Sequence, residues 1–318
     1  MHRDPALTVR GLAIEVAGAR AVDGVSLELE PGKLLALVGE SGSGKSLTAL
    51  ACVRLLPRAA RVVAGEIRCR GRSVLDLDAA ALRALRGKEI GFVFQEPMTA
   101  LHPTIRVGEQ VAEAILVHER VAPREARARA TALLERVGIP EPARRYGAYA
   151  HELSGGQRQR VGIAMALAAG PSVLIADEPT TALDASVRKG ILDLIGDLRR
   201  ERGLAVLLVT HDLGVVAAAA DEVAVLYAGR IVERAPAAVA LEGPLHPYTR
   251  GLLRSIPRLD GARRARLDAI PGAIPPPRAR PSGCRFRDRC AEAIADCATA
   301  DPPLAAKRPD HAVACIRA

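Results

Sequence analysis

A glycine-rich loop between a buried strand and a helix constrains the fold of this chain more than any other feature. Residues Lys33–Val38 (KLLALV) form an apolar run that is typical of a buried strand. The loop Gly39-Glu-Ser-Gly-Ser-Gly-Lys-Ser46 follows at once and fits the pattern G-x-x-x-x-G-K-[ST]. In such a loop, glycines let backbone N–H groups converge on phosphate oxygens, and the next helix points its positive end at the same charge. The sequence therefore predicts a phosphate site in an α/β sheet protein.

Each residue type in this loop has an expected task. Lys45 should reach the β- and γ-phosphates of a nucleotide, and Ser46 should ligate Mg²⁺. The residues expected to line the phosphates are Gly39, Ser41, Gly42 and Gly44. The alternative is a glycine-rich turn that binds nothing, but the order of strand, loop and helix favours a phosphate site.

A second apolar run, Val173–Ala176, ends in two carboxylates, Asp177 and Glu178. Proteins of the α/β class place their ligand chemistry at the carboxyl ends of parallel strands. We therefore expect Asp177 to hold the Mg²⁺ shell and Glu178 to orient and deprotonate an attacking water. On its own, such a pair would ordinarily be a cap or a surface feature. Beside a phosphate loop it predicts an NTPase, which could be a kinase, a GTPase or a motor.

The composition of the chain changes near residue 235. Before it, apolar runs alternate with helical patterns, and the alternating segment 7–16 predicts an antiparallel β region. After it, prolines cluster at 271–281 and predict an extended linker. We expect a main domain at 1–235, which includes a helical subdomain at about 96–160, and a small C-terminal extension at 236–318.

Hydropathy argues against a membrane span in this sequence. No uncharged stretch reaches the ~18–20 residues that cross a bilayer, and the longest, 161–176, is interrupted by Gly170-Pro171. The N-terminus lacks the apolar core of a signal peptide. We expect a chain that stays in the cytoplasm and meets the membrane through partners.

The charge balance is basic, with 45 Lys and Arg against 36 Asp and Glu and a net charge of +9. A nucleic-acid binder is one explanation of this surplus. The arginines are scattered, however, and aromatic residues make up 2% of the chain, so few rings could stack on bases. We therefore expect a solvated basic surface near anionic lipid headgroups, and no bound nucleic acid.

The sequence Leu153-Ser-Gly-Gly-Gln157 separates the NTPase classes. It matches the LSGGQ signature without change, and over about residues 6–235 the chain resembles the ABC ATPase family. The resemblance implies a P-loop NTPase fold of the ABC-ATPase type, with an antiparallel β subdomain and a helical signature subdomain. It also implies that 39–46 is the Walker A loop and 173–178 is Walker B.

The same resemblance implies roles for five further residues. Gln95 would be the Q-loop glutamine, which ligates Mg²⁺ and acts as a hinge between the nucleotide and the transmembrane partner. His211 would be the switch histidine that senses the γ-phosphate. Asp184 would belong to the D-loop, Ala182-Leu183-Asp184. Ser154 and Gly156 would present a hydroxyl and backbone N–H groups at a helix N-terminus, which is a second anion-binding surface. The resemblance implies that this surface acts in trans, so that two chains enclose two ATP molecules head to tail.

The sequence departs from the family at one position. ABC ATPases usually stack adenine on an aromatic residue shortly before the Walker A loop. The segment LAIEVAGARAVDG offers Val16 there and contains no aromatic residue. We therefore expect an aliphatic adenine contact and relaxed base selectivity.

Two segments are similar to oligopeptide and dipeptide importers. The first is Phe94–Gln110, in which His102 stands where Asn is more common, and the second is His246–Pro257 (HPYTRGLLRSIP). The resemblance implies an importer ATPase on the cytoplasmic face of the inner membrane. Its implied partners are a second ABC ATPase subunit, two permeases and an extracytoplasmic solute-binding protein, and the IPG sequence at 270–272 favours a heterodimer.

Other functions stay open at this point. The cargo could be nickel or another small solute instead of peptides. An ABC ATPase that acts on nucleic acid would usually carry a long coiled coil or zinc inserts between its Walker motifs, and no sustained heptads occur here. A regulatory ABC protein would usually have two ATPase units, whereas this sequence contains one phosphate loop.

Six cysteines in a cytoplasmic chain argue against a disulfide framework. Cys52 and Cys69 are isolated and predict buried small residues. The other four cysteines are Cys284, Cys290, Cys297 and Cys315. Their spacing, C-x₅-C-x₆-C-x₁₇-C, is poor for zinc and unlike common ferredoxin patterns. The resemblance implies a 4Fe–4S cluster, while zinc or simple packing of a small module remain alternatives.

Overall fold

The computed structural model describes residues 4–95, 100–180, 183–255 and 269–318. Its contacts group into two compact units. Unit 1 contains Met1–Leu7, Leu29–Lys33 and Arg68–Leu208, and unit 2 contains Thr8–Glu28, Leu34–Ile67 and Val209–Ala318. No helix within these described ranges is long and apolar enough to cross a membrane.

Unit 2 is organised around parallel and antiparallel strands that follow one another in the order β11-β12-β10-β9-β3. The strands are β3 (Leu34–Val38), β9 (Glu222–Tyr227), β10 (Arg230–Pro236), β11 (Ala305–Arg308) and β12 (His311–Val313). All five residues of β3 are buried, and β3 pairs in parallel with β9. Because β10 pairs antiparallel with both β9 and β12, the end of the chain extends the same sheet.

A smaller sheet has the order β2-β1-β4-β5, and most of its residues belong to unit 2. Its strands are β1 (Leu7–Val16), β2 (Ala19–Leu29), β4 (Ala60–Cys69) and β5 (Arg72–Ser73). Ala17 and Gly18 join β1 to β2 with φ values of 48° and 76°. Neighbouring strands joined by two residues of positive φ form a hairpin, so the antiparallel β region predicted at 7–16 is present.

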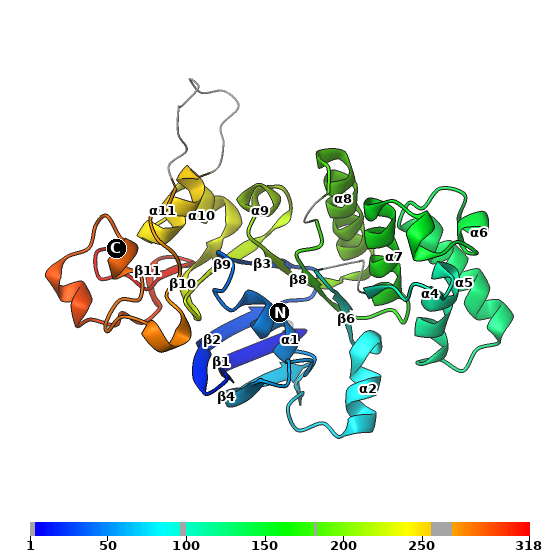
Figure 1. Cartoon of the computed structure of the whole chain (residues 1–318), viewed down its shortest axis with the longest axis horizontal. Helices are drawn as coiled ribbons and strands as arrows, with labels where there is room; N and C mark the ends of the chain where they lie inside the picture. The colour runs from blue at the N-terminus through cyan, green and yellow to red at the C-terminus, as the bar shows by residue number, and fades with distance from the viewer. Residues whose placement is uncertain (1–3, 96–99, 181–182, 256–268) are drawn as a thin grey trace. The chain divides into compact units, whose positions relative to one another are not determined.

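Helices dominate unit 1, where α4 to α7 lie together (Figure 1). The helices of this unit are α2 (Ala79–Lys88), α4 (Val107–Leu116), α5 (Pro123–Arg136), α6 (Pro142–Arg145), η1 (Ala150–Glu152), α7 (Gly155–Leu167) and α8 (Ala185–Arg202). Strands β6 (Ile90–Val93) and β7 (Val173–Asp177) pair in parallel, and β8 (Ala205–Thr210) is the neighbour of β7. β7 and β8 are buried throughout, as expected for strands covered on both faces.

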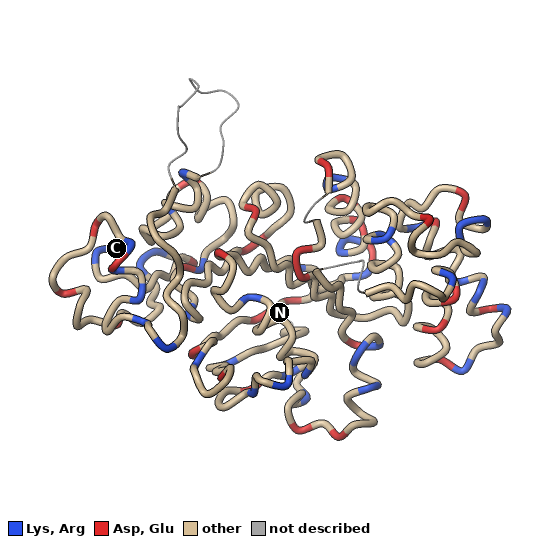
Figure 2. The backbone as a smooth tube through the Cα atoms, in the orientation of Figure 1, with Lys and Arg blue, Asp and Glu red and all other residues tan. Residues whose placement is uncertain are grey.

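The remaining helices belong to unit 2 and are short. They are α1 (Lys45–Ala51), α9 (Leu213–Ala219), α10 (Ala237–Glu242), α11 (Pro247–Arg254), η2 (Pro277–Ala279), η3 (Arg287–Arg289) and η4 (Ala295–Ala298). Basic and acidic residues are interspersed along the chain trace in both units (Figure 2), in agreement with the predicted scatter of arginines.

Candidate nucleotide site

The predicted phosphate loop connects β3 to α1 in unit 2. Gly39 has a φ of 159°, and a Cβ there would lie 2.2 Å from the carbonyl oxygen of Leu226, so no larger residue fits. Gly44 caps α1 with a φ of 109°, in the left-handed region that favours glycine. The helix therefore begins at Lys45, where the motif predicts it.

The side chain of Lys45 is folded back over this loop. The residue is 5% exposed, and its Nζ donates to the carbonyl oxygens of Gly39 at 2.7 Å and Glu40 at 3.0 Å. Ser46 follows in the first turn of α1 and is half-buried, whereas Ser41 and Gly42 are exposed. The cationic side chain of Lys45 and the hydroxyl of Ser46 therefore lie on the same short segment, as the motif requires.

The two predicted carboxylates lie at the end of β7 in unit 1. Asp177 is 5% exposed and Glu178 is 8% exposed. Glu178 has a φ of 48°, a left-handed conformation that costs a non-glycine residue about 1–2 kcal/mol. Nε2 of Gln95 donates to Oε2 of Glu178 at 3.1 Å, across 83 residues of sequence. The two predicted site residues Gln95 and Glu178 are therefore in contact.

The signature segment begins α7 in unit 1. The Ser154 hydroxyl accepts from the backbone N–H of Gln157 at 3.3 Å, and Oε1 of Gln157 accepts from the Ser154 N–H at 3.0 Å. This capping box fixes the helix N-terminus. A Cβ at Gly156 would lie 2.6 Å from Val187 Cγ1, so this glycine lets α7 approach α8 closely. Ser154 remains exposed.

Two other predicted residues lie at a helix start and just after a strand. Asp184 caps α8, and its carboxylate accepts from the N–H groups of Ser186 at 3.0 Å and Val187 at 2.9 Å. These bonds, above all the one from Val187, hold the pKa of Asp184 below its usual value. His211 follows β8 in unit 2 and is exposed. Ala182 and residues 96–99 of the predicted importer-type segment lie outside the described residues.

Comparison with known proteins identifies the family. Residues 22–181 match the family described as ABC transporter, and residues 232–297 match the one described as Oligopeptide/dipeptide transporter, C-terminal region. BMEII0863 of Brucella melitensis, named as a peptide import ATP-binding protein, is 49% identical over 332 aligned positions, which cover 100% of this chain and 98% of that protein. The chain belongs to the ABC transporter family.

Two further similarities refine this assignment. The oligopeptide transport ATP-binding protein OppD of Mycobacterium tuberculosis is 52% identical over 298 residues, which cover 93% of this ABC ATPase and 48% of OppD. The solved post-hydrolysis dimer of the ATP-binding cassette MJ0796, bound to ADP and Pi, is 31% identical with a TM-score of 0.65, over 73% of this chain and 98% of that one. The predicted ABC-ATPase fold is therefore confirmed, and the chain is an ATP-hydrolysing transport subunit.

The isolated cysteines of this ABC ATPase are buried, as predicted. Burial, reinforced by the neighbouring Glu89 carboxylate, raises the pKa of the Cys69 thiol to about 12. The four C-terminal cysteines form no disulfide. Burial raises the pKa values of Cys284 and Cys290, and the nearby thiols of the other cysteines add to this effect. Within the described ranges, no group of three or more His, Cys, Asp or Glu side chains is arranged to hold a metal ion.

Sequence reasoning missed a set of contacts to the phosphate loop of this ABC ATPase. Glu40, a variable position of the motif, is bound by Arg289 and Tyr248 from the C-terminal extension. Tyr248 belongs to the HPYT segment, which the sequence analysis had already singled out. No sequence pattern near Arg289 predicts its contact with Glu40, which lies 249 positions earlier.

Proposed function

We propose that this chain is the ATP-hydrolysing subunit of a peptide importer, which drives uptake of oligopeptides or dipeptides through partner permeases. The observation that carries this proposal is the match of residues 232–297 to the C-terminal region of oligopeptide and dipeptide transporters. The cassette itself is shared by ABC transporters of many cargoes, so the cargo class rests on this extension. Relatives named for peptide import and for oligopeptide transport support the same cargo.

The proposed catalytic roles are those that the motifs imply. Lys45, which now donates to the loop carbonyls, is proposed to contact the β- and γ-phosphates, and Ser46, Gln95 and Asp177 are proposed as oxygen ligands of Mg²⁺. The ion would neutralise charge that develops on the phosphates. Glu178 is the proposed general base, and its hydrogen bond to Gln95 supports a shared role in orienting the attacking water.

A second chain is proposed to complete each site. His211 would sense the γ-phosphate, and Ser154, Gly156 and Asp184 of one chain would act on the nucleotide held by the other. The exposed Ser154 at the N-terminus of α7 supports this role, because a helix N-terminus that faces solvent can accept an anion from a partner. The MJ0796 cassette, solved as a dimer with ADP and Pi, supports an assembly of two chains.

The partner subunits are proposed from the resemblance to importers. We propose a second, different ABC ATPase as the partner, with two permeases and an extracytoplasmic solute-binding protein. The chain would lie at the cytoplasmic face of the inner membrane, with residues 1–235 as the ATPase domain, 96–160 within it as the helical subdomain, and 236–318 as the extension.

We further propose that the four C-terminal cysteines hold a 4Fe–4S cluster. After burial, the thiols of Cys297 and Cys315 are among the causes that raise the pKa values of both Cys284 and Cys290, which supports a grouping of these cysteines. Within the described residues no group of side chains is arranged to hold a metal ion, and we assign no catalytic step to the cluster. Protein purified without oxygen should show an absorbance band near ~400 nm. Zinc in place of iron, with no such band, would reject the cluster.

Uptake by cells tests the cargo. In a strain that lacks this chain, labelled di- and oligopeptides should fail to enter, and wild-type protein should restore their uptake whereas Lys45→Ala should not. Labelled Ni²⁺ is the matched control cargo. Restoration of nickel uptake without any change in peptide uptake would replace the peptide assignment with the small-solute alternative.

A further inference from the structure

The carboxylate of Glu40 is held by an arginine of the C-terminal extension. Arg289 Nη1 lies 2.7 Å from Glu40 Oε2, and its Nη2 lies 3.0 Å from Oε1, so the pair is bidentate. Arg289 is itself fixed, because its Nε donates to the carbonyl oxygen of Pro271 at 2.7 Å and its guanidinium lies 5.7 Å from the ring centroid of Tyr227. The Arg289 side chain is 7% exposed and that of Glu40 is 30% exposed. This ion pair is therefore largely shielded from solvent.

The backbone of Glu40 is held as well. Its N–H donates to the hydroxyl of Tyr248 at 2.8 Å, and its carbonyl oxygen accepts from Lys45 Nζ at 3.0 Å. Tyr248 is fully buried, and its ring lies 5.4 Å from that of Phe286. Continuous contacts thus run from the extension through Glu40 to the lysine of the phosphate loop.

Other arginines of the extension bind backbone carbonyls of unit 2. Arg278, Arg280 and Arg285 each donate at 2.7 Å, to the carbonyl oxygens of residues 17, 21 and 228 respectively. The Gly229 N–H, next along the chain, donates to the carbonyl oxygen of Ser43 at 2.8 Å.

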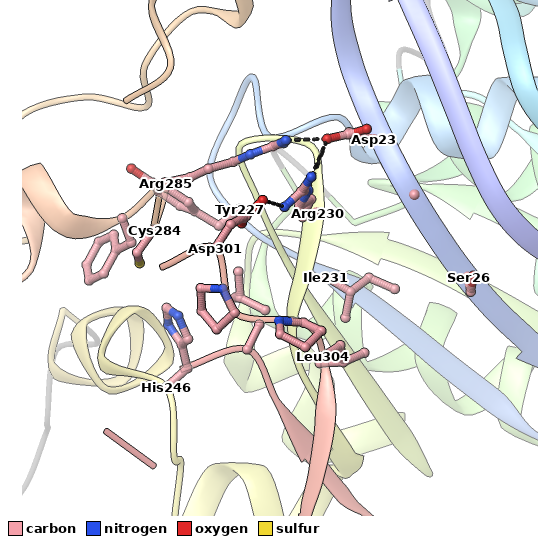
Figure 3. A pocket seen from close by; sticks show the side chains of 16 residues that line it. Asp23, Ser26, Tyr227, Arg230, Ile231, His246, Cys284, Arg285, Asp301 and Leu304 are labelled. Atoms are coloured by element: carbon pink, nitrogen blue, oxygen red, sulfur yellow. Dashed lines mark hydrogen bonds and ion pairs between the residues drawn. The ribbon is translucent and has the colours of Figure 1, made fainter. Parts of the chain in front are cut away.

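Asp23 forms ion pairs with two arginines, Arg230 and Arg285. Figure 3 shows these contacts beside a cavity of about 480 Å³. The segment expected to be an extended linker, 271–281, is attached to other parts of unit 2 through Arg278 and Arg280.

The placement of Arg289 has an electrostatic consequence. A carboxylate at the second position of a phosphate loop repels the nucleotide's phosphates unless a cation neutralises it. A glycine-rich loop also loses conformational freedom when its N–H groups converge on phosphate, and a loop already held in place loses less. The ion pair removes the repulsion, and the Tyr248 hydrogen bond restricts the backbone.

We propose that the C-terminal extension positions the phosphate loop for ATP, with Arg289 and Tyr248 as positioning residues that act through Glu40. This inference rests on the proposed function of residues 39–46 as the ATP site. It predicts an asymmetry: loss of the arginine leaves an unpaired carboxylate beside the phosphates, whereas loss of both charges does not.

The test compares KM for ATP and kcat in full-length variants. Arg289→Gln should raise KM about tenfold with kcat within about twofold, because it weakens binding more than chemistry. Glu40→Gln combined with Arg289→Gln should return KM to within about threefold of wild type. Tyr248→Phe should raise KM about threefold by leaving the Glu40 N–H without its acceptor. The control is Arg250→Gln, which breaks the ion pair of Arg250 with Glu292 in the same extension and should leave KM unchanged.

Three results would overturn the inference. One is a KM for ATP in the double variant that is as high as in Arg289→Gln. Another is a rise of KM in Arg250→Gln that equals the rise in Arg289→Gln. If Arg289→Gln fails to fold, an unchanged KM in Tyr248→Phe is the third. Failure of the proposed function looks different, because Lys45→Ala would then leave ATP hydrolysis intact, and that result would overturn both proposals.

Discussion

Glu178 is the residue on which ATP hydrolysis is proposed to depend. It ends a fully buried strand, adopts a left-handed backbone conformation and accepts a hydrogen bond from Gln95. Strained backbone of this kind persists where the surrounding structure holds it, and it is common at functional sites. The carboxylate is thereby placed at the end of β7 and not within the strand. This placement suits a base that must reach a water molecule outside the sheet.

Replacing this carboxylate tests its role. Glu178→Gln should keep ATP binding, since the amide is similar in shape, and should reduce turnover by at least about a hundredfold, since the amide cannot take a proton. Steady-state hydrolysis and equilibrium ATP binding would measure the two effects, and the variant should accumulate as an ATP-bound dimer. Hydrolysis within about threefold of wild type would show that another group is the base.

At the scale of elements, helix α11 is anchored through His246. Its Nδ1 accepts from the Tyr248 N–H at 3.1 Å and caps the helix, and its own N–H donates to the buried carboxylate of Glu233 at 3.1 Å. The same carboxylate is 2.7 Å from Nε2 of His311 in β12. One buried anion therefore connects β10, α11 and the last strand. Removing it would leave several donors unsatisfied.

The titration of His246 predicts a pH dependence of stability. Burial, with a smaller contribution from Arg250, lowers its pKa from 6.5 to about 3. The unfolded chain therefore binds this proton more readily than the folded chain does. The contribution of His246 to the free energy of unfolding is fully present above about pH 6.5 and is lost as the pH falls toward 3. Between these values the loss approaches about 1.4 kcal/mol per pH unit.

Urea unfolding at about pH 7 and pH 5 would measure this loss. His246→Asn keeps a side-chain acceptor for the cap but does not titrate, so its stability should change less between the two conditions. An equal change in both proteins would assign the pH dependence to other groups.

Local motifs account for what the sequence predicts of these elements. The phosphate loop, the end of β7 and the start of α7 are each specified by adjacent residues, so their form follows from the sequence. The bond between Gln95 and Glu178 joins residues 83 positions apart, and the sequence analysis did not predict it. The pair of Glu40 and Arg289 has no local signal, because neither residue belongs to a pattern that names the other.

At the scale of the whole molecule, the C-terminal extension belongs to unit 2, which also contains the phosphate loop. Its strands β11 and β12 continue the sheet from β10, and its Arg289 binds Glu40 of the loop. Composition alone predicted a C-terminal extension at 236–318 that contains a proline-rich linker at 271–281. It could not predict this attachment, because proline clusters indicate extended backbone but not what the backbone lies against. The extension that identifies the cargo class thus also contacts the loop that is proposed to bind ATP.

The most direct test of the account is to identify the proteins that assemble with this chain. A tagged copy would be extracted gently from native membranes, and every co-purifying protein would be identified. We expect two permeases and a second ABC ATPase, with a peptide-binding protein encoded beside them. Recovery from the soluble fraction alone, with DNA or repair proteins attached, would contradict the transport function while leaving ATP hydrolysis intact.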